Sequence, residues 1–204
     1  MRKFLLMLLA PALLYIPLGM AESVVSLQVE KDYRVISGRL SHFPKVLEFF
    51  SYACIHCKEL DPSITQWASE AGDSVLLTRV PVTFGNKKMK GYTKAFYVGE
   101  ALGLQTVTHR ALFQLMEHGG KLESDQAIAD FFAGLSVPRE TTKKKLNSFA
   151  VQYRIAQGEM LAHRYKIRSV PSFVVNNKYY TDPSMLGSPE AVPAALTQLT
   201  TLHD

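Results

Sequence analysis

The sequence predicts an α/β fold with a helical domain inserted into it. Strand patterns occupy the two ends of the mature chain, residues 22–84 and 161–204, whereas helical patterns follow one another through residues 85–160. Short apolar runs bounded by Gly, Pro and Asn indicate the strands. The expected order is an edge strand, a β-α-β unit, the helical domain and a β-β-α ending, which is one α/β unit interrupted by an insertion.

Residues 1–21 have the layout of a secretory signal peptide. Arg2 and Lys3 give a positive start, Phe4–Met20 is almost wholly apolar, and Gly19-Met20-Ala21 is a small-x-small cleavage site. The alternative is a retained membrane anchor, which is disfavoured because the run is short and contains two prolines. Secretion would place the cysteines in an oxidising compartment, where disulfides persist.

The charge pattern does not indicate nucleic-acid binding. Loss of the signal peptide lowers the formal net charge from +5 to about +3. The one dense basic run, Lys143–Lys145, has no interleaved aromatic residues and is expected on a solvated helix face.

The first strands are expected to place two charged residues in the interior. After a possible edge strand at Tyr33–Ile36, Lys45–Phe50 is the expected central strand and Val75–Val82 its neighbour. Glu48 interrupts the first run, and a buried carboxylate needs a partner or a proton. Arg79 is the candidate partner; the alternative is that both residues lie near a sheet edge and reach water.

Four helices are expected in the insertion. Three histidines in this region, His109, His118 and His163, are expected as packing or surface residues rather than ligands, and Gly158 is a candidate bend in the last helix. The expected helices are Tyr92–Leu104, Val107–His118, Ser124–Leu135 with a Ser cap, and Pro138–Tyr165.

Strand patterns return after the insertion. Ile167–Val175 is an expected buried strand with Pro171 near its start, and Asn176-Asn177 is a tight turn leading to a return strand at Lys178–Tyr180. Ser188-Pro189-Glu190 is expected to open the final helix.

The only two cysteines, Cys54 and Cys57, stand at the start of the helix that follows the central strand. A helix N-terminus presents unpaired N–H groups and partial positive charge, so the pKa of a Cys54 thiol should fall. Cys57 is one turn further and more buried, which makes Cys54 the attacking and Cys57 the resolving sulfur. His56 could donate a hydrogen bond to the Cys54 sulfur or add charge near it. The helix also contains Pro62, which should kink it.

Three other roles for the cysteine pair are weaker. A structural disulfide would close a very small loop, a zinc site needs further ligands, and haem attachment needs a His where Lys58 stands. The cysteines therefore indicate thiol–disulfide exchange, and no metal is expected.

The motifs resemble the thioredoxin fold: C-x-x-C after a strand, a proline eight residues past the first Cys, and Val170-Pro171 before an apolar strand. The finer resemblance is to the DsbA family of periplasmic thiol–disulfide oxidoreductases. It is based on Val46–Ser51 leading to Cys54-x-His56-Cys57, on the helical insertion, and on the stretch from Val170 to Tyr179.

The resemblance implies roles for individual residues. Cys54 would be the nucleophile, Cys57 the resolving thiol, Pro171 a cis-proline facing the disulfide, and Val170 the residue whose backbone meets an extended substrate. Glu48 and Arg79 would be the charged pair beneath the cysteines. The family commonly has Pro-His between the cysteines; Ile55 stands in place of that proline, which affects the expected redox poise.

The same resemblance implies a monomeric oxidase without a cofactor in the periplasm of a Gram-negative bacterium. It would donate the Cys54–Cys57 disulfide to reduced, unfolded secreted proteins and be reoxidised by a DsbB-like quinone-linked membrane oxidase. Two alternatives remain open: a disulfide isomerase or reductase with the same site, and a non-enzymatic metal-binding or chaperone module that uses Cys54, His56 and Cys57.

Overall fold

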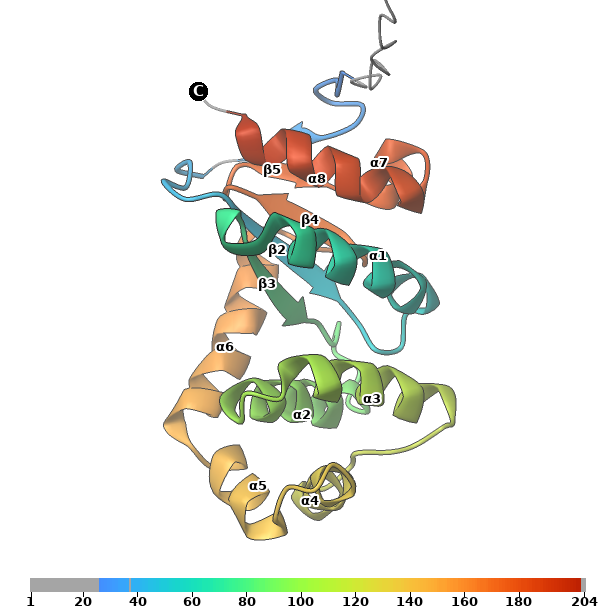
Figure 1. Ribbon diagram of the computed structural model, residues 1–204, viewed down its shortest axis with the longest axis vertical. Helices are drawn as coiled ribbons and strands as arrows, with labels where there is room; N and C mark the ends of the chain where they lie inside the picture. Colours follow the sequence, from blue (N-terminus) through green and yellow to red (C-terminus); the bar gives the residue numbers. More distant parts are fainter. Residues whose placement is uncertain (1–25, 37, 203–204) are drawn as a thin grey trace, which may run out of the picture.

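The computed structural model describes residues 26–36 and 38–202, so the expected signal peptide at 1–21 lies outside the described residues. The described part has an α/β unit built on one sheet and a block of helices beside it, joined by the long helix α6 (Figure 1). No helix among the described residues is both long and apolar enough to cross a membrane.

The sheet has the strand order β1-β5-β4-β2-β3. Strand β2 is flanked by β3, which is parallel to it, and by β4, which is antiparallel. The strands are β1 (Arg34–Val35), β2 (Lys45–Phe50), β3 (Leu76–Pro81), β4 (Ser172–Val175) and β5 (Tyr179–Thr181).

Helices cover both faces of the sheet. Helices α1 and α8 lie over the face shown in Figure 1, and the C-terminal part of α6 packs on the other face through Leu161 and Ala162. The helices are α1 (Ile55–Ala71), α2 (Met89–Ala101), α3 (Gln105–Glu117), α4 (Asp125–Gly134), α5 (Arg139–Leu146), α6 (Phe149–Arg164), α7 (Pro183–Leu186) and α8 (Val192–Thr201), with 3-10 turns at Gly72–Ser74 and Pro189–Ala191.

Strand β2 contributes to all three hydrophobic cores. Successive side chains of a strand point to opposite faces, so Val46 packs under α1 and α8 whereas Leu47 and Phe49 pack toward α6. Phe50, at the end of the strand, enters the core of the helical block. The strand therefore ends at the junction between the sheet and the helical block, and the cysteines follow there.

Most predicted elements are confirmed, with shifts of a few residues at their ends. The strand at 45–50 has its predicted bounds, and Ile64 and Trp67 of α1 are buried as expected. Ser124 caps α4, where its hydroxyl accepts the Ala127 N–H at 3.1 Å.

Three details of the prediction are wrong. The predicted helix 138–165 is interrupted at Asn147-Ser148, where Ser148 caps α6, and Gly158 lies inside that helix rather than at a bend. Strand β4 begins at Ser172 rather than Ile167, after the proline. The final α-helix begins only at Val192, because Pro189–Ala191 forms a 3-10 turn.

Candidate active site

Cys54 and Cys57 lie at the N-terminal end of α1, and both are free thiols. Cys54 is the N-cap residue: its Sγ accepts the backbone N–H of Cys57 at 3.3 Å. The Cys54 thiol also donates to the carbonyl oxygen of Val170 at 3.4 Å. Cys57 is only 1% exposed, whereas Cys54 is partly exposed, so the two sulfurs differ in access.

The two thiols also differ in acidity. A hydrogen bond from the Cys57 thiol lowers the pKa of Cys54 to about 6, with help from the backbone N–H groups of Cys57 and His56 and against the effect of burial. The same hydrogen bond and burial raise the pKa of Cys57. A proton shared by the pair therefore stays on the inner sulfur, and the outer sulfur holds the negative charge.

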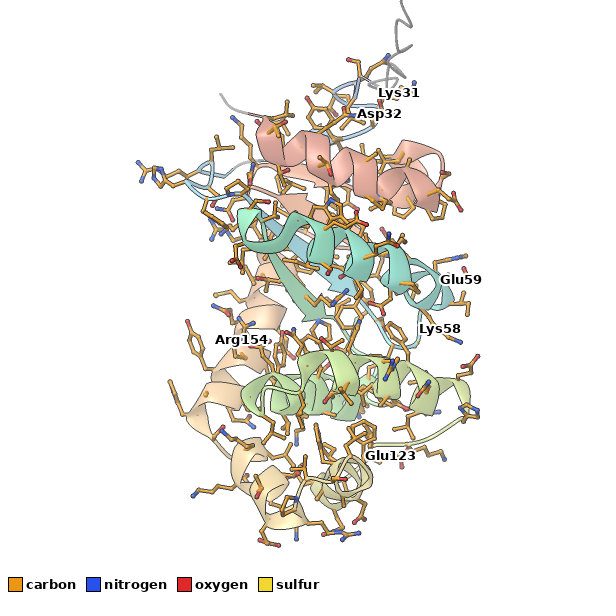
Figure 2. The ribbon with its side chains drawn as sticks, in the orientation of Figure 1. Lys31, Asp32, Lys58, Glu59, Glu123 and Arg154 are labelled. Carbon is orange, nitrogen blue, oxygen red and sulfur yellow. The ribbon has the colours of Figure 1, made fainter. Side chains whose placement is uncertain are left out.

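His56 acts on Cys54 through its backbone and its charge. Its Nδ1 lies 3.3 Å from Glu59 Oε2 rather than at the sulfur, so of the two predicted effects of His56 the structure has the charge near Cys54 and not the side-chain hydrogen bond. The His56 side chain is 74% exposed. Glu59 and its neighbour Lys58 project outward at the same end of α1 (Figure 2).

Glu48 and Arg79 form the predicted pair. They are opposite each other in the parallel β2–β3 register, and Arg79 Nε donates to Glu48 Oε2 at 2.9 Å. Glu48 is 2% exposed, which excludes the alternative in which it reaches water. Burial raises the pKa of Glu48, although the Arg79 charge opposes that effect.

Two further members of this charged cluster were missed by the sequence analysis. Asp61 Oδ1 lies 3.1 Å from Arg79 Nη2 and 3.0 Å from His109 Nε2. Asp61 could have been found, because it stands four residues after Cys57 and so lies on the same face of α1. His109 had no comparable signal, since its contact with α1 depends on how α3 packs.

Val170 and Pro171 lie beside the cysteines, as expected. The peptide bond between them is cis, and the Val170 carbonyl faces the Cys54 thiol. A pocket of about 330 Å³ adjoins this site. Its lining residues come from α1, the cis-proline loop and the α7 region: His56, Ser169, Val170, Pro171, Asp182, Pro183, Ser184, Gly187, Ser188 and Pro189.

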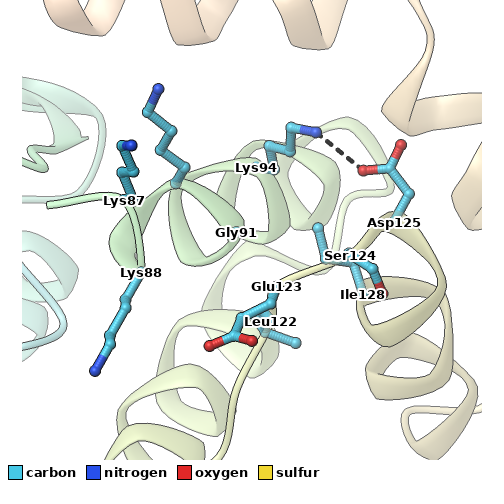
Figure 3. Close-up of a pocket in the computed structure, with 10 residues that line it drawn as sticks. Lys87, Lys88, Gly91, Lys94, Leu122, Glu123, Ser124, Asp125 and Ile128 are labelled. Atoms are coloured by element: carbon cyan, nitrogen blue, oxygen red, sulfur yellow. Dashed lines mark hydrogen bonds and ion pairs between the residues drawn. The ribbon is translucent and has the colours of Figure 1, made fainter. Parts of the chain in front are cut away.

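A separate hollow of about 380 Å³ lies in the helical block, between the start of α2 and the segment that precedes α4. Lysines surround it, but Lys87 and Lys88 point in opposite directions, and Lys94 is paired with Asp125 at 2.9 Å (Figure 3). The basic groups do not converge on one point, so this hollow has no arrangement suited to a single anion.

Comparison with known proteins assigns the family. Residues 65–191 match the family model described as a DSBA-like thioredoxin domain, which is more than half of the chain. This protein belongs to the DSBA-like family. The thiol:disulfide interchange protein DsbA of Pseudomonas syringae is 33% identical over 156 residues, which are 76% of this chain and 72% of that protein. The DsbA of Azotobacter vinelandii is 35% identical over 72% of this chain and 68% of that protein.

The structures agree with the sequences. The crystal structure of Pseudomonas aeruginosa DsbA is 29% identical, with a TM-score of 0.75, and the match covers 84% of this chain and 90% of that one. The predicted thioredoxin-like fold with an inserted helical region is thereby confirmed. The family makes this chain a DsbA-like thiol–disulfide oxidoreductase.

Proposed function

We propose that this protein oxidises thiols of secreted proteins by donating a Cys54–Cys57 disulfide. The observation that best supports oxidation rather than reduction is the asymmetry of the two cysteines. The partly exposed Cys54 sulfur has a pKa lowered to about 6, and the Cys57 sulfur is buried. A stable thiolate at Cys54 favours the reduced form, and a protein with a stable reduced form is an oxidant. (DsbA itself is the general illustration of this relation.)

In the proposed reaction a client thiolate attacks the Cys54 sulfur. The Cys54–Cys57 bond breaks, a client–Cys54 disulfide forms, and Cys57 leaves as a thiolate that takes a proton because its pKa is raised. A second client thiolate then attacks the client sulfur of the mixed disulfide, and Cys54 leaves as a thiolate. The client loses two electrons to form its disulfide, and the protein gains them as a dithiol.

Glu48 and Arg79 are suited to assist the first step of the exchange, in which Cys57 leaves as a thiolate. Glu48 lies close enough for its charge to disfavour the Cys57 thiolate, and its own pKa is raised by burial. Because its pKa is raised, the Glu48 carboxylate takes up a proton more readily than an exposed carboxylate and can pass that proton to a buried thiolate. We assign Glu48 and Arg79 to this tuning of the cysteines.

Val170 and Pro171 are the proposed contact for the client. The Val170 carbonyl already accepts a hydrogen bond from Cys54, so an extended client chain would lie next to the reacting sulfur. The adjoining pocket of about 330 Å³ can take a client side chain.

The proposed cellular setting is based on the signal peptide expected at 1–21 and on the resemblance to the DsbA family. We place the protein in the periplasm of a Gram-negative bacterium, as a monomer reoxidised by a DsbB-like quinone-linked membrane partner. Both electrons pass between sulfur atoms, so the proposed reaction requires no metal or organic cofactor.

Single cysteine variants test the two roles. Cys54→Ser should abolish exchange with a reduced client. Cys57→Ser, first converted at Cys54 to a mixed disulfide with oxidised glutathione, should exchange the glutathione for a client thiol and accumulate a client–Cys54 disulfide, detectable as a mass increase on a non-reducing gel. Equal trapping by both variants would contradict the assignment.

The redox equilibrium with glutathione tests the direction. We expect the Cys54–Cys57 pair to be more oxidising than glutathione. A strongly reducing pair would instead favour a reductase, and a dimer in size-exclusion chromatography would favour an isomerase.

A further inference from the structure

His109 belongs to the helical block, yet it contacts the segment that contains the cysteines. It is on α3 and only 4% exposed. Its Nδ1 lies 2.8 Å from the Tyr52 hydroxyl, and its Nε2 lies 3.0 Å from Asp61 Oδ1. Tyr52 precedes Cys54 by two residues, and Asp61 follows Cys57 by four. The imidazole therefore joins the insertion to both sides of the C-x-x-C segment.

The ring of His109 is held in one orientation. Four aromatic rings surround it at centroid distances of 4.9 to 5.8 Å, with their planes inclined to it by 62 to 87°. Both ring nitrogens have partners, so rotation of the ring would break one buried and one partly buried hydrogen bond. The four neighbours are Phe50, Tyr52, Phe96 and Phe113.

The charge of the cluster depends on His109. Arg79 is shared by two carboxylates, because it contacts Glu48 at 2.9 Å and Asp61 at 3.1 Å. With both carboxylates ionised and a neutral imidazole, the cluster has one excess negative charge, and an imidazolium at His109 would cancel it. A positive charge at His109 favours the ionised form of Glu48.

Protons can reach the cluster from solvent. A pocket of about 410 Å³ between α1 and α3 is lined by His109, Asp61 and Arg79. The other charged or titratable groups that face this region are Lys58 on α1, Arg110 and Glu117 on α3, Tyr52 before α1, and Tyr97 on α2, which acts on Tyr52.

We propose that His109 is a positioning residue for thiol exchange, whose protonation sets the charge of the Glu48–Arg79–Asp61 cluster beside the cysteines. This inference rests on the proposed exchange at Cys54 and Cys57. The reduced form has a negative charge at Cys54, and the oxidised form has none, so the reduced form binds a proton on His109 more tightly. Reduction is therefore coupled to proton uptake at His109 as well as at the thiols, over the pH range in which Cys54 is a thiolate.

The test compares the glutathione equilibrium of the wild type and His109→Gln between about pH 5.5 and about pH 8.5. Gln keeps an N–H donor for Asp61 but has no charge. We expect the variant to be about threefold harder to reduce just above pH 6, where Cys54 is a thiolate, and to match the wild type at the alkaline end. His118→Gln is the control, because His118 is exposed at the residue that follows α3, where its Nδ1 lies 2.7 Å from the Gln114 carbonyl oxygen. If the ratio of the wild-type to the variant equilibrium constant with glutathione does not change with pH, the proposal is overturned.

An NMR titration of the His109 ring in the wild type needs no variant, so a folding defect in His109→Gln leaves the idea testable. We expect a higher titration midpoint in the reduced protein than in the oxidised one, and equal midpoints would overturn the proposal. If the cysteines fail to equilibrate with glutathione at every pH, the proposed exchange itself is wrong. A normal equilibrium with a constant ratio refutes only the role of His109.

Discussion

At the scale of single residues, the acidity of Cys54 comes first from the hydrogen bond of the Cys57 thiol and then from the backbone around Cys54. The sulfur occupies the cap position that Ser or Asp usually fills, and it accepts an N–H of the first helical turn. Ile55 stands where proline is common in the family, and the N–H groups on which the lowered pKa depends belong to His56 and Cys57. The structure thus lowers the pKa of Cys54 without that proline.

Alkylation should report this acidity directly. In the reduced protein, the rate of Cys54 modification by iodoacetamide should rise with a midpoint near pH 6, because the thiolate is the reactive form and the pKa of Cys54 is lowered to about 6. Peptide mapping by mass spectrometry should find Cys57 unmodified over the same range. A midpoint near that of an ordinary thiol, about 8.5, would contradict the assigned environment.

Arg79 should be important for stability, because it is the permanent cation between Glu48 and Asp61. Arg79→Met leaves the buried Glu48 and the partly buried Asp61 without it and should lower the free energy of unfolding by about 3–5 kcal/mol. Urea denaturation measures the loss. Arg139→Met is the matched control: Arg139 pairs with Asp130 on the surface, where an ion pair contributes little. Similar losses in both variants would show that burial of the pair has no special effect.

The sequence predicted the charged residues of the sheet but not those of the helices. Glu48 was detectable because a carboxylate inside an apolar strand is unusual, and Arg79 because the next strand had one candidate partner. His109 is a helical histidine among apolar residues, a pattern that packing alone explains. Its role depends on the approach of α3 to α1, which no local pattern encodes.

At the scale of elements, the helical block depends on close backbone contacts. A Cβ at Gly91 of α2 would collide with the carbonyl oxygen of Leu122, in the segment that leads to α4. Because that atom belongs to the backbone, it cannot move aside as a flexible side chain would. The position of α4 relative to α2 therefore requires glycine at residue 91.

A pair of alanine substitutions tests this contact. Gly91→Ala should destabilise the protein by about 1–3 kcal/mol through overpacking. Gly134→Ala, at the end of α4, meets no neighbouring atom within 4 Å and should stabilise it by about 0.5 kcal/mol, because alanine is the better helix former. Thermal and urea unfolding of both variants gives the comparison; a stable Gly91→Ala would mean that the segment before α4 can move away.

Element boundaries were predictable where a local signal exists. Ser124 before α4 is such a signal and was used. Ser148 is an equal signal for α6, but the helical pattern continues on both sides of it, so the sequence favours a bend at Gly158 over the break that occurs at Asn147-Ser148. Packing explains the glycine at residue 158, because a Cβ there would press on the Tyr97 hydroxyl. The short helix α7 has only four residues, too few for a periodic pattern.

At the scale of the whole molecule, the oxidised and reduced forms should differ in how their stability depends on pH. The pKa of Cys54 is about 6 in the folded reduced protein, against 9.0 for the unperturbed group. The unfolded chain therefore binds more protons between these values, so the stability contribution of Cys54 is fully present above the unfolded pKa and is lost as pH falls through the folded pKa. Cys57 opposes this only at alkaline pH, because its pKa is raised. The oxidised form has neither thiol and lacks the effect.

Urea denaturation of both redox forms from about pH 8 to about pH 5 tests this expectation. The midpoint of the reduced form should fall relative to that of the oxidised form as pH is lowered through 6. Cys54→Ser is the control: it has no thiolate at that position and cannot form the disulfide, so its midpoint should show no such fall relative to the oxidised wild type. Parallel curves for the two redox forms would mean that the folded structure does not stabilise the Cys54 thiolate. The reduced form would then not be the more stable one, and the proposed oxidase activity would have no physical basis, although the fold and the family would be unchanged.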